Sequence, residues 1–213
     1  MSNLTLALGR PTLADRIFSR SLALDVVLVA AGAALTAVAA QIAVPLWPVP
    51  VTGQTLAVIL VGLSLGAVRG GLSMALYAVL GIVGLPVFSD SSSGWNVVAG
   101  PTGGYIIGFI FASVLTGWLA QRSWDRKLLR SFAATLAGTA ATFVIGLPWL
   151  AAYLGNVGAP NDLASVLAAG LYPFILGGFI KAALGAGIIS LAWAGVRRSD
   201  RRRADRLEAE GAE

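Results

Sequence analysis

Cysteine and histidine are both absent from this chain of 213 residues. Without cysteine there is no disulfide framework, no thiolate nucleophile and no cysteine-based zinc or iron–sulfur site. Without histidine the commonest general base and metal ligand is missing, which excludes a serine–histidine triad. The only two lysines, Lys127 and Lys181, follow an arginine and an isoleucine, so the glycine–lysine pair of a phosphate-binding P-loop is missing too. We therefore expect no metal, no cofactor and no ATPase activity of that class from this chain by itself.

Charged residues are also scarce, at 12% of the chain, whereas 57% of the residues are hydrophobic and the mean hydropathy is +0.81. Such a composition is typical of a protein embedded in a lipid bilayer. The net charge of +5 and the pI near 10.2 would also suit a nucleic-acid-binding protein. The basic residues, however, cluster where cytoplasmic loops are expected, so the predicted partner is membrane lipid and not nucleic acid.

Long apolar runs predict an all-α fold, a polytopic membrane protein with six transmembrane helices. The predicted helices cover residues 22–44, 53–68, 71–86, 103–120, 131–153 and 166–196, between an N-terminal tail at 1–21 and a C-terminal tail at 197–213. The second and third are short and are separated only by Arg69-Gly70-Gly71, so we expect a tight helical hairpin that crosses the bilayer incompletely. Short spans interrupted by Gly or Pro are typical of the surroundings of a substrate site.

The basic residues also predict an orientation in the membrane. If both termini are cytoplasmic, all 15 lysines and arginines except Lys181 lie on the inner side. The outer segments then contain no Lys or Arg; they cover residues 45–52, 87–102 and 154–165. Because loops rich in Lys and Arg stay in the cytoplasm, we expect this topology.

Lys181 is the basic residue that remains inside a predicted span, near the outer end of the last helix. A charged side chain at this depth is costly and points to a function. Two interpretations stay open: the ammonium faces the bundle and meets an anionic ligand, or it extends to the outer headgroups. No acidic residue lies at helical spacing from it, since positions 177, 178, 184 and 185 are Gly, Gly, Leu and Gly.

The outer segment from Gly84 to Tyr105 mixes Gly and Pro with hydroxyls, an amide and aromatic side chains. It is richer than a simple connection requires, so it is either a lid or binding loop, or a solvent-exposed turn. Its candidate contacts to a ligand are Phe88, Ser92, Trp95, Asn96 and Tyr105. The proline-rich segment 45–54 is similar, and Gln54 at its end either meets a ligand or bonds a neighbouring backbone carbonyl.

Small residues recur every four positions in several predicted helices; one such stripe is Gly104, Gly108, Ala112 and Thr116. These stripes allow helix backbones to approach each other where the hydrophobic effect does not separate helix from lipid. Internal packing accounts for most of them. Ala30 and Ala34 of the first helix could instead form a docking face for a partner subunit.

Four ordered segments give the chain a family likeness. Val49-Pro-Val-Thr-Gly-Gln-Thr-Leu56, Gly84-Leu-Pro-Val-Phe88, Gly100-Pro-Thr-Gly-Gly-Tyr105 and the run from Pro173 to Lys181 resemble, in order and spacing, the motifs of BioY-type biotin transport subunits. The resemblance covers about residues 22–196. It implies a multi-pass plasma-membrane protein, the substrate-binding (S) component of an energy-coupling factor (ECF) transporter. Such a subunit captures biotin from outside, is not an enzyme, and works with a transmembrane coupling subunit and cytoplasmic ATPase subunits.

The resemblance also implies a site. Lys181 matches the family motif, whereas Gly178 stands where the family usually has an aspartate. Biotin offers a ureido ring with donors and an acceptor, an apolar sulfur ring and an anionic valerate chain. Either end could meet Lys181, and charge pairing favours the carboxylate. At the ureido edge we expect either Asn96 or Gln54, together with a loop hydroxyl such as that of Ser92, and against the rings we expect Phe88, Trp95 and Tyr172.

Two further function classes are compatible with the sequence. One is an S component of the same architecture for another small vitamin or carboxylate. The other is an intramembrane enzyme, which would need a nucleophile and a base that a chain without His or Cys does not readily provide.

Overall fold

A computed structural model of the chain describes residues 11–210. The predictions that concern residues 1–10, including the basic Arg10, and residues 211–213 lie outside the described part. In chain order the elements are α1 (Leu13–Ile17), α2 (Leu22–Ala40), β1 (Ala43–Val44), β2 (Val51–Thr52), α3 (Gln54–Leu65), α4 (Ala67–Ile82), η1 (Ser89–Ser91), α5 (Trp95–Ala99), α6 (Gly103–Gln121), η2 (Trp124–Arg126), α7 (Leu128–Asn156), α8 (Leu163–Gly170) and α9 (Tyr172–Glu210).

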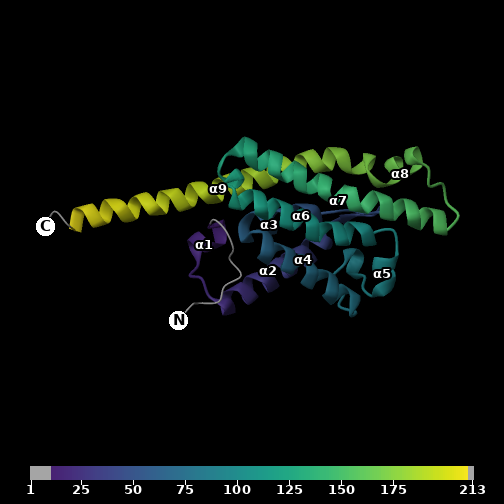
Figure 1. Cartoon of the computed structure of the whole chain (residues 1–213), viewed down its shortest axis with the longest axis horizontal. Helices are drawn as coiled ribbons and strands as arrows, with labels where there is room; N and C mark the ends of the chain where they lie inside the picture. The colour runs from purple at the N-terminus through teal and green to yellow at the C-terminus, as the bar shows by residue number, and fades with distance from the viewer. Residues whose placement is uncertain (1–10, 211–213) are drawn as a thin grey trace.

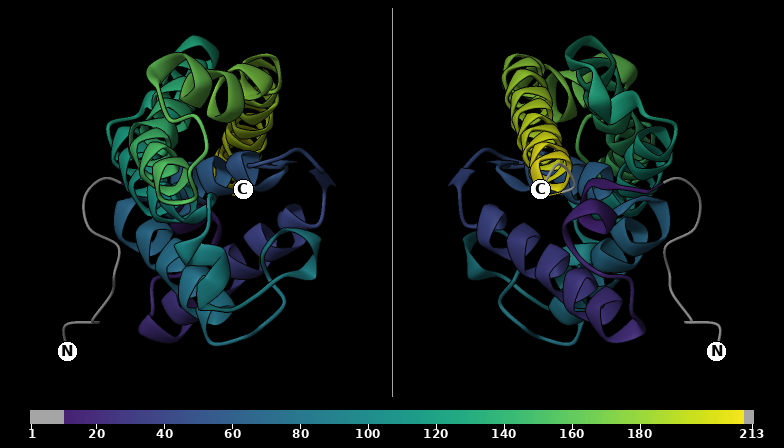
Figure 2. Two further views of the ribbon diagram at one scale, coloured as in Figure 1. Left: turned by 90° about the vertical axis from the view of Figure 1, so that its right-hand side faces the viewer. Right: turned by 90° about the vertical axis from the view of Figure 1, so that its left-hand side faces the viewer.

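The helices form an elongated bundle from which the end of α9 projects (Figure 1). Helices α5 and α8 lie at one end of the bundle, and α1 lies at the other, on the side of the projecting end of α9. Seen along the bundle, α7 to α9 gather on one side, and α2 and α4 on the other (Figure 2). Helix α6 packs against α3, α4 and α7 and is the centre of the bundle.

Small residues allow α6 to take this central position. Gly104, Gly108, Ala112 and Thr116, the predicted stripe, are all buried. A Cβ at Gly108 would lie 2.8 Å from the backbone oxygen of Thr142, so only glycine allows α6 and α7 to pack this closely. For α6, the stripe therefore serves internal packing.

Within the described residues, four helices are long and apolar enough to cross a membrane: α2, α6, α7 and α9. Helices α3 and α4 have 12 and 16 residues. At about 1.5 Å per residue they fall short of the roughly 30 Å of a bilayer core. They form the short helical hairpin that the sequence predicts, but the turn lies elsewhere.

The predicted turn at Arg69-Gly70-Gly71 is wrong, because the chain turns at Gly66 and Arg69 lies inside α4. Gly66 has φ +87°, a left-handed conformation that glycine adopts without strain. Arg69 is only 2% exposed. A charged residue near a hairpin turn favours a loop position in the sequence, whereas the guanidinium of Arg69 has buried partners in the fold.

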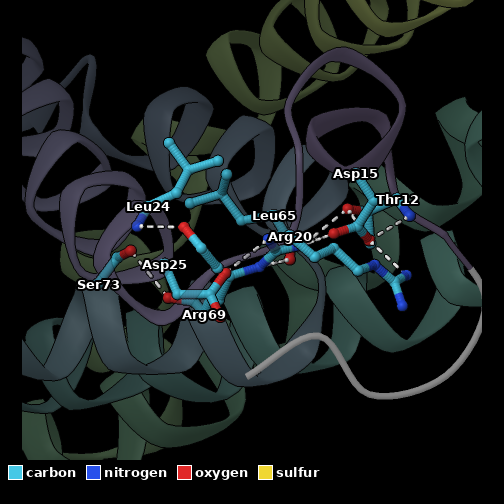
Figure 3. A network of polar contacts seen from close by, with 9 residues as sticks. Thr12, Asp15, Arg20, Leu24, Asp25, Leu65, Arg69 and Ser73 are labelled. Atoms are coloured by element: carbon cyan, nitrogen blue, oxygen red, sulfur yellow. Dashed lines mark hydrogen bonds and ion pairs between the residues drawn. The ribbon is translucent and has the colours of Figure 1, made fainter. Parts of the chain in front are cut away.

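Those partners form a polar network at the α1 end of the bundle (Figure 3). Arg69 contacts Asp15 at 2.8 Å and Asp25 at 3.1 Å, and donates a hydrogen bond to Thr12 Oγ1 at 3.0 Å. Burial would raise the pKa of the Asp15 carboxyl, but hydrogen bonds from Thr12 and the charge of Arg69 outweigh it, so this pKa lies below its ordinary value. The network ties α1 to α2 and α4.

Two predicted spans also end or break where proline intervenes. The first ends at Ala40 instead of residue 44; Pro45 favours an extended residue before it, and Val44 lies in β1, opposite Val51 of β2. The last predicted span is divided at Leu171 into α8 and α9. Pro173 has no backbone N–H to donate to the preceding turn, and its ring clashes with that turn, so the helix is interrupted before it. Beyond residue 196, α9 continues as a helix through most of the predicted C-terminal tail, to Glu210.

Candidate functional site

A cavity lies within the bundle, towards the end that carries α5 and α8. Its empty volume, which includes space open to solvent, is about 560 Å³. Residues from six parts of the chain line it: Val49, Pro50, Thr52, Gln54, Thr55, Phe88, Ser89, Val97, Thr102, Tyr105, Ile106, Phe109, Thr142, Phe143, Phe174 and Lys181. No Asp or Glu is among these described lining residues.

Lys181 of α9 is the cationic group of the cavity. Its Nζ donates hydrogen bonds to the backbone oxygen of Thr52 at 2.5 Å and to Thr55 Oγ1 at 3.0 Å. The ammonium is therefore directed into the bundle, which contradicts the alternative that it extends to the headgroups. Both acceptors are neutral and an ammonium has three donors, so one N–H donor of Lys181 remains for an anionic group.

Gln54, the first residue of α3, contributes an amide beside this lysine. Its Nε2 donates to the hydroxyl of Tyr77 at 2.5 Å, and its Oε1 accepts from Thr52 Oγ1 at 2.7 Å. The amide bonds side chains and not a neighbouring backbone carbonyl. These two hydrogen bonds fix the orientation of the Gln54 amide, and one N–H and one oxygen lone pair of the amide remain for a ligand.

Aromatic rings form the apolar part of the cavity. Tyr105 of α6 lies 5.9 Å from Phe143 of α7 and 6.3 Å from Phe174 of α9, measured between ring centroids. The Tyr105 hydroxyl donates to the backbone oxygen of Gly170 at 3.0 Å, which fixes α6 against the α8–α9 junction. Phe88, only 1% exposed, closes the cavity from the segment before α5. An amphipathic ligand with an anionic end suits these walls.

The structure brings four of the predicted contacts to the cavity and leaves four outside its lining. Lys181, Gln54, Phe88 and Tyr105 line it. Ser92 and Asn96 line a surface depression beside it. Trp95 is 63% exposed and Tyr172 is 57% exposed, and neither contributes to the cavity or to that depression. The chain reverses at Asp90 and Ser91, both with positive φ, and this turn leaves Trp95 and Asn96 on the exposed side of α5.

Sequence reasoning missed several lining residues. Thr52 and Thr55 lie inside the 49–56 motif, and Phe174 follows Pro173 in the last motif, so the motifs themselves were the signal. Thr142 and Phe143 lie on the apolar helix α7. The sequence of such a helix does not distinguish residues that face the cavity from residues that face lipid. Ala30 and Ala34, the predicted docking residues, are both exposed on α2.

Comparison with known proteins identifies the family. Residues 11–198 match the BioY family. The chain is 42% identical over 159 residues to the probable biotin transporter BioY of Pyrococcus horikoshii, covering 75% of this chain and 90% of that one. It is 36% identical over 148 residues to the biotin transporter BioY of Thermotoga maritima, covering 70% and 83%.

A solved structure has the same fold. The crystal structure of the S-component for biotin from an ECF-type ABC transporter matches with a TM-score of 0.67 and 24% identity, over 79% of this chain and 89% of that chain. This match and the four apolar helices describe a multi-pass membrane protein. The resemblance seen in the sequence motifs is confirmed, and the chain belongs to the BioY family.

Proposed function

We propose that this chain is the biotin-binding S component of an ATP-driven ECF importer in the plasma membrane. The chain is a transport subunit and not an enzyme, and its partners are a transmembrane coupling subunit and ATPase subunits. The observation that carries this proposal is the ammonium of Lys181, held at the wall of the cavity by neutral oxygens alone. A small acid with an apolar body complements such a site, and membership of the BioY family supports biotin as that acid.

In this proposal the biotin carboxylate pairs with Lys181. The rings pack against Tyr105 and Phe88, and the free donor and acceptor of Gln54 meet polar atoms of the ligand. The surface depression that holds Ser92 and Asn96 shares lining residues with the cavity, so these two side chains are proposed to lie at its entrance. Trp95 and Tyr172 are assigned no contact.

The topology proposed for the chain has both termini in the cytoplasm. Four long helices cross the bilayer, and the α3–α4 hairpin completes the six-helix arrangement with two shorter passages. The cavity then opens towards the outer face, because it lies at the end opposite the basic residues of α1, η2 and the end of α9. The exposed Ala30 and Ala34 on α2 are proposed to dock the coupling subunit.

The chain has a matched pair of lysines for testing this proposal. Lys181→Ala should weaken biotin binding to the purified protein by at least about tenfold, or roughly 1.4 kcal/mol, because the ligand carboxylate loses its cationic partner. Lys127→Ala removes the same charge from the loop between α6 and α7, and should leave the affinity unchanged. Isothermal titration calorimetry measures both. Equal affinities of wild type and Lys181→Ala would contradict the assigned site.

Native mass spectrometry of the protein purified without added ligand tests the ligand itself. Biotin should be the small molecule that remains bound. Retention of a different vitamin or carboxylate would contradict biotin as the substrate while leaving the architecture of the site in place.

A further inference from the structure

A segment between α4 and α6 lies between the cavity and the surface. We call residues 87–102 the cover. Phe88, Ser89, Val97 and Thr102 of the cover line the cavity, and the last three also line the adjoining surface depression. A ligand that passes between the cavity and this surface must therefore pass the cover.

The cover is anchored to α4 by packing and by the backbone. The ring of Phe88 lies against Gly81 and edge-on to Tyr77, with 5.5 Å between the two ring centroids. The backbone N–H of Gly94 donates to the oxygen of Gly81 at 2.7 Å. These contacts hold the two ends of the 88–94 turn to one helix.

A different helix holds the tip of this turn, through one side chain. Gln41 caps the C-terminus of α2, and its Nε2 donates to Phe88 O at 3.0 Å and to Ala37 O of its own helix at 3.1 Å. Its Oε1 accepts from Ser91 N at 3.0 Å and from Ser91 Oγ at 3.3 Å. One amide therefore spans from α2 to both sides of the turn.

The turn itself needs such external support. Asp90 and Ser91 have φ values of 55° and 54°, in the left-handed region that non-glycine residues rarely adopt. A conformation of this kind persists only where surrounding contacts fix it. The hydrogen bond from Ser91 N to Gln41 fixes it at the strained residue.

We propose that Gln41 is a positioning residue that fastens the cover to α2 and limits the rate at which bound ligand leaves the cavity. This inference rests on the proposed function. The hydrogen bonds of Gln41 lie in exposed or half-buried surroundings, where they are weak enough to open and close. Because α2 also carries Ala30 and Ala34, a displacement of α2 on docking would act on the cover through Gln41.

The test measures dissociation of radiolabelled biotin from the purified full-length protein after dilution into unlabelled biotin. Gln41→Leu removes every hydrogen bond of the side chain while keeping its size, and should accelerate dissociation by about tenfold, which corresponds to about 1.4 kcal/mol. Ser91→Ala removes only the hydroxyl contact and should change the rate by less than about twofold. Gln121→Leu alters a glutamine at the far end of α6 and should leave the rate unchanged.

Two results would overturn the inference: a Gln41→Leu dissociation rate within about twofold of wild type, or a weaker affinity caused by association alone. The wild type is measured first. A wild type that binds no biotin contradicts the proposed function, whereas equal rates of wild type and Gln41→Leu contradict only the role of Gln41.

A cross-link tests the same contact in the opposite direction, without relying on a weakened variant. The chain has no cysteine, so Gln41→Cys with Ser91→Cys provides the only pair. Bridging the two cysteines with a short bifunctional methanethiosulfonate should slow biotin exchange by at least about tenfold relative to the unbridged variant. Reduction of the bridge should restore the exchange rate of the unbridged variant. Exchange at the unbridged rate in the bridged protein would overturn the inference.

Discussion

Lys181 lies within the apolar part of α9, where an isolated charge is unfavourable. Its ammonium donates a hydrogen bond to the backbone oxygen of Thr52, at the point where β2 ends and α3 begins. Irregular backbone at this depth requires polar partners inside the protein. Lys181 therefore lies beside the first turn of α3, and one of its N–H donors remains available to a ligand.

Gly178 offers a test of that charge. It lines an apolar groove between α7 and α9 and lies one turn from Lys181; the nearest neighbour of an added Cβ is Thr139 Cγ2 at 3.8 Å. Gly178→Asp therefore fits, and its carboxylate at (i, i+3) spacing can pair with Lys181. The preference for biotin over its uncharged methyl ester should fall by several-fold, as measured by competition binding. An unchanged preference would contradict pairing of Lys181 with the ligand carboxylate.

Gly81 tests the packing of Phe88 in the same way. A Cβ at Gly81 would overlap the Phe88 ring, so Gly81→Ala should displace the ring and destabilise the protein by about 1–3 kcal/mol. Thermal unfolding in detergent measures the loss. Gly187→Ala on α9 is the matched control: nothing lies within 4 Å of its added Cβ, and it should not destabilise. Equal melting temperatures for both variants would contradict the tight packing of Phe88.

Asp125 predicts a pH dependence of stability. This carboxyl in η2 is fully buried and accepts a hydrogen bond from Trp193 Nε1 at 2.6 Å. Burial raises its pKa to about 6, against the opposing effects of Trp193 and Arg126. The folded protein thus binds this proton more tightly than the unfolded chain, so stability gained at low pH is lost as the pH rises from about 4 through about 6.

Asp125→Asn keeps an acceptor for Trp193 and removes the titration. The melting temperature of the wild type should rise between pH 8 and pH 5, and that of the variant should change much less over the same range. Asp15 does not interfere, because its lowered pKa places its contribution at more acidic pH. Parallel pH profiles of the two proteins would contradict the assignment.

At the scale of elements, hydropathy predicts the long helices and the short α3–α4 hairpin well. It fails at Gly66, Leu171 and Arg69 for different reasons. A run of apolar residues continues through the first two breaks, which depend on backbone conformation and on Pro173. Arg69 was misplaced because its partner Asp15 lies 54 positions away along the chain, and composition carries no sign of such a contact.

The candidate site was predictable to a similar extent. Lys181 and Gln54 stand out because polar residues are rare in apolar spans, and both line the cavity. Trp95 was equally unusual in sequence but is exposed, because the direction of a side chain on α5 depends on the turn that precedes it. Chemical type can be read from sequence, whereas orientation after an irregular segment requires coordinates.

The attachment of α1 to the bundle depends on Arg69. Arg69→Met leaves Asp15 and Asp25 buried without this cation, and should destabilise the protein by about 3–5 kcal/mol. It should also release α1, so that limited trypsin digestion cuts at Arg16 and Arg20. Mass spectrometry identifies the cleavage sites.

Arg122→Met is the control for this experiment. Its guanidinium lies on the surface over Trp118, 3.9 Å from the ring centroid, and should contribute at most about 1 kcal/mol. If trypsin cleaves at Arg16 no faster in Arg69→Met than in Arg122→Met, the anchoring role of the network is contradicted.

At the scale of the whole molecule, the positions of the basic residues and of the cavity predict one orientation in the membrane. Helix α1, η2 and the end of α9 share one end of the bundle, and α5 and α8 lie at the other (Figure 1). Apart from Lys181, the described lysines and arginines lie on α1, between α1 and α2, on α4, in the α6–α7 connection, at the start of α7 and on the end of α9. In the proposed topology these residues stay in the cytoplasm, and the cavity opens towards the outside.

Because the wild type has no cysteine, single cysteines report this topology directly. Val157→Cys, after α7, should react with a membrane-impermeant maleimide in intact cells. Phe18→Cys and Ser199→Cys, near the two ends, should react only after permeabilisation, because both lie on the basic side. All three positions are exposed, so a lack of labelling reflects the membrane and not burial. Labelling of Phe18→Cys and Ser199→Cys from opposite sides would require an odd number of crossings and contradict the shared location of the termini.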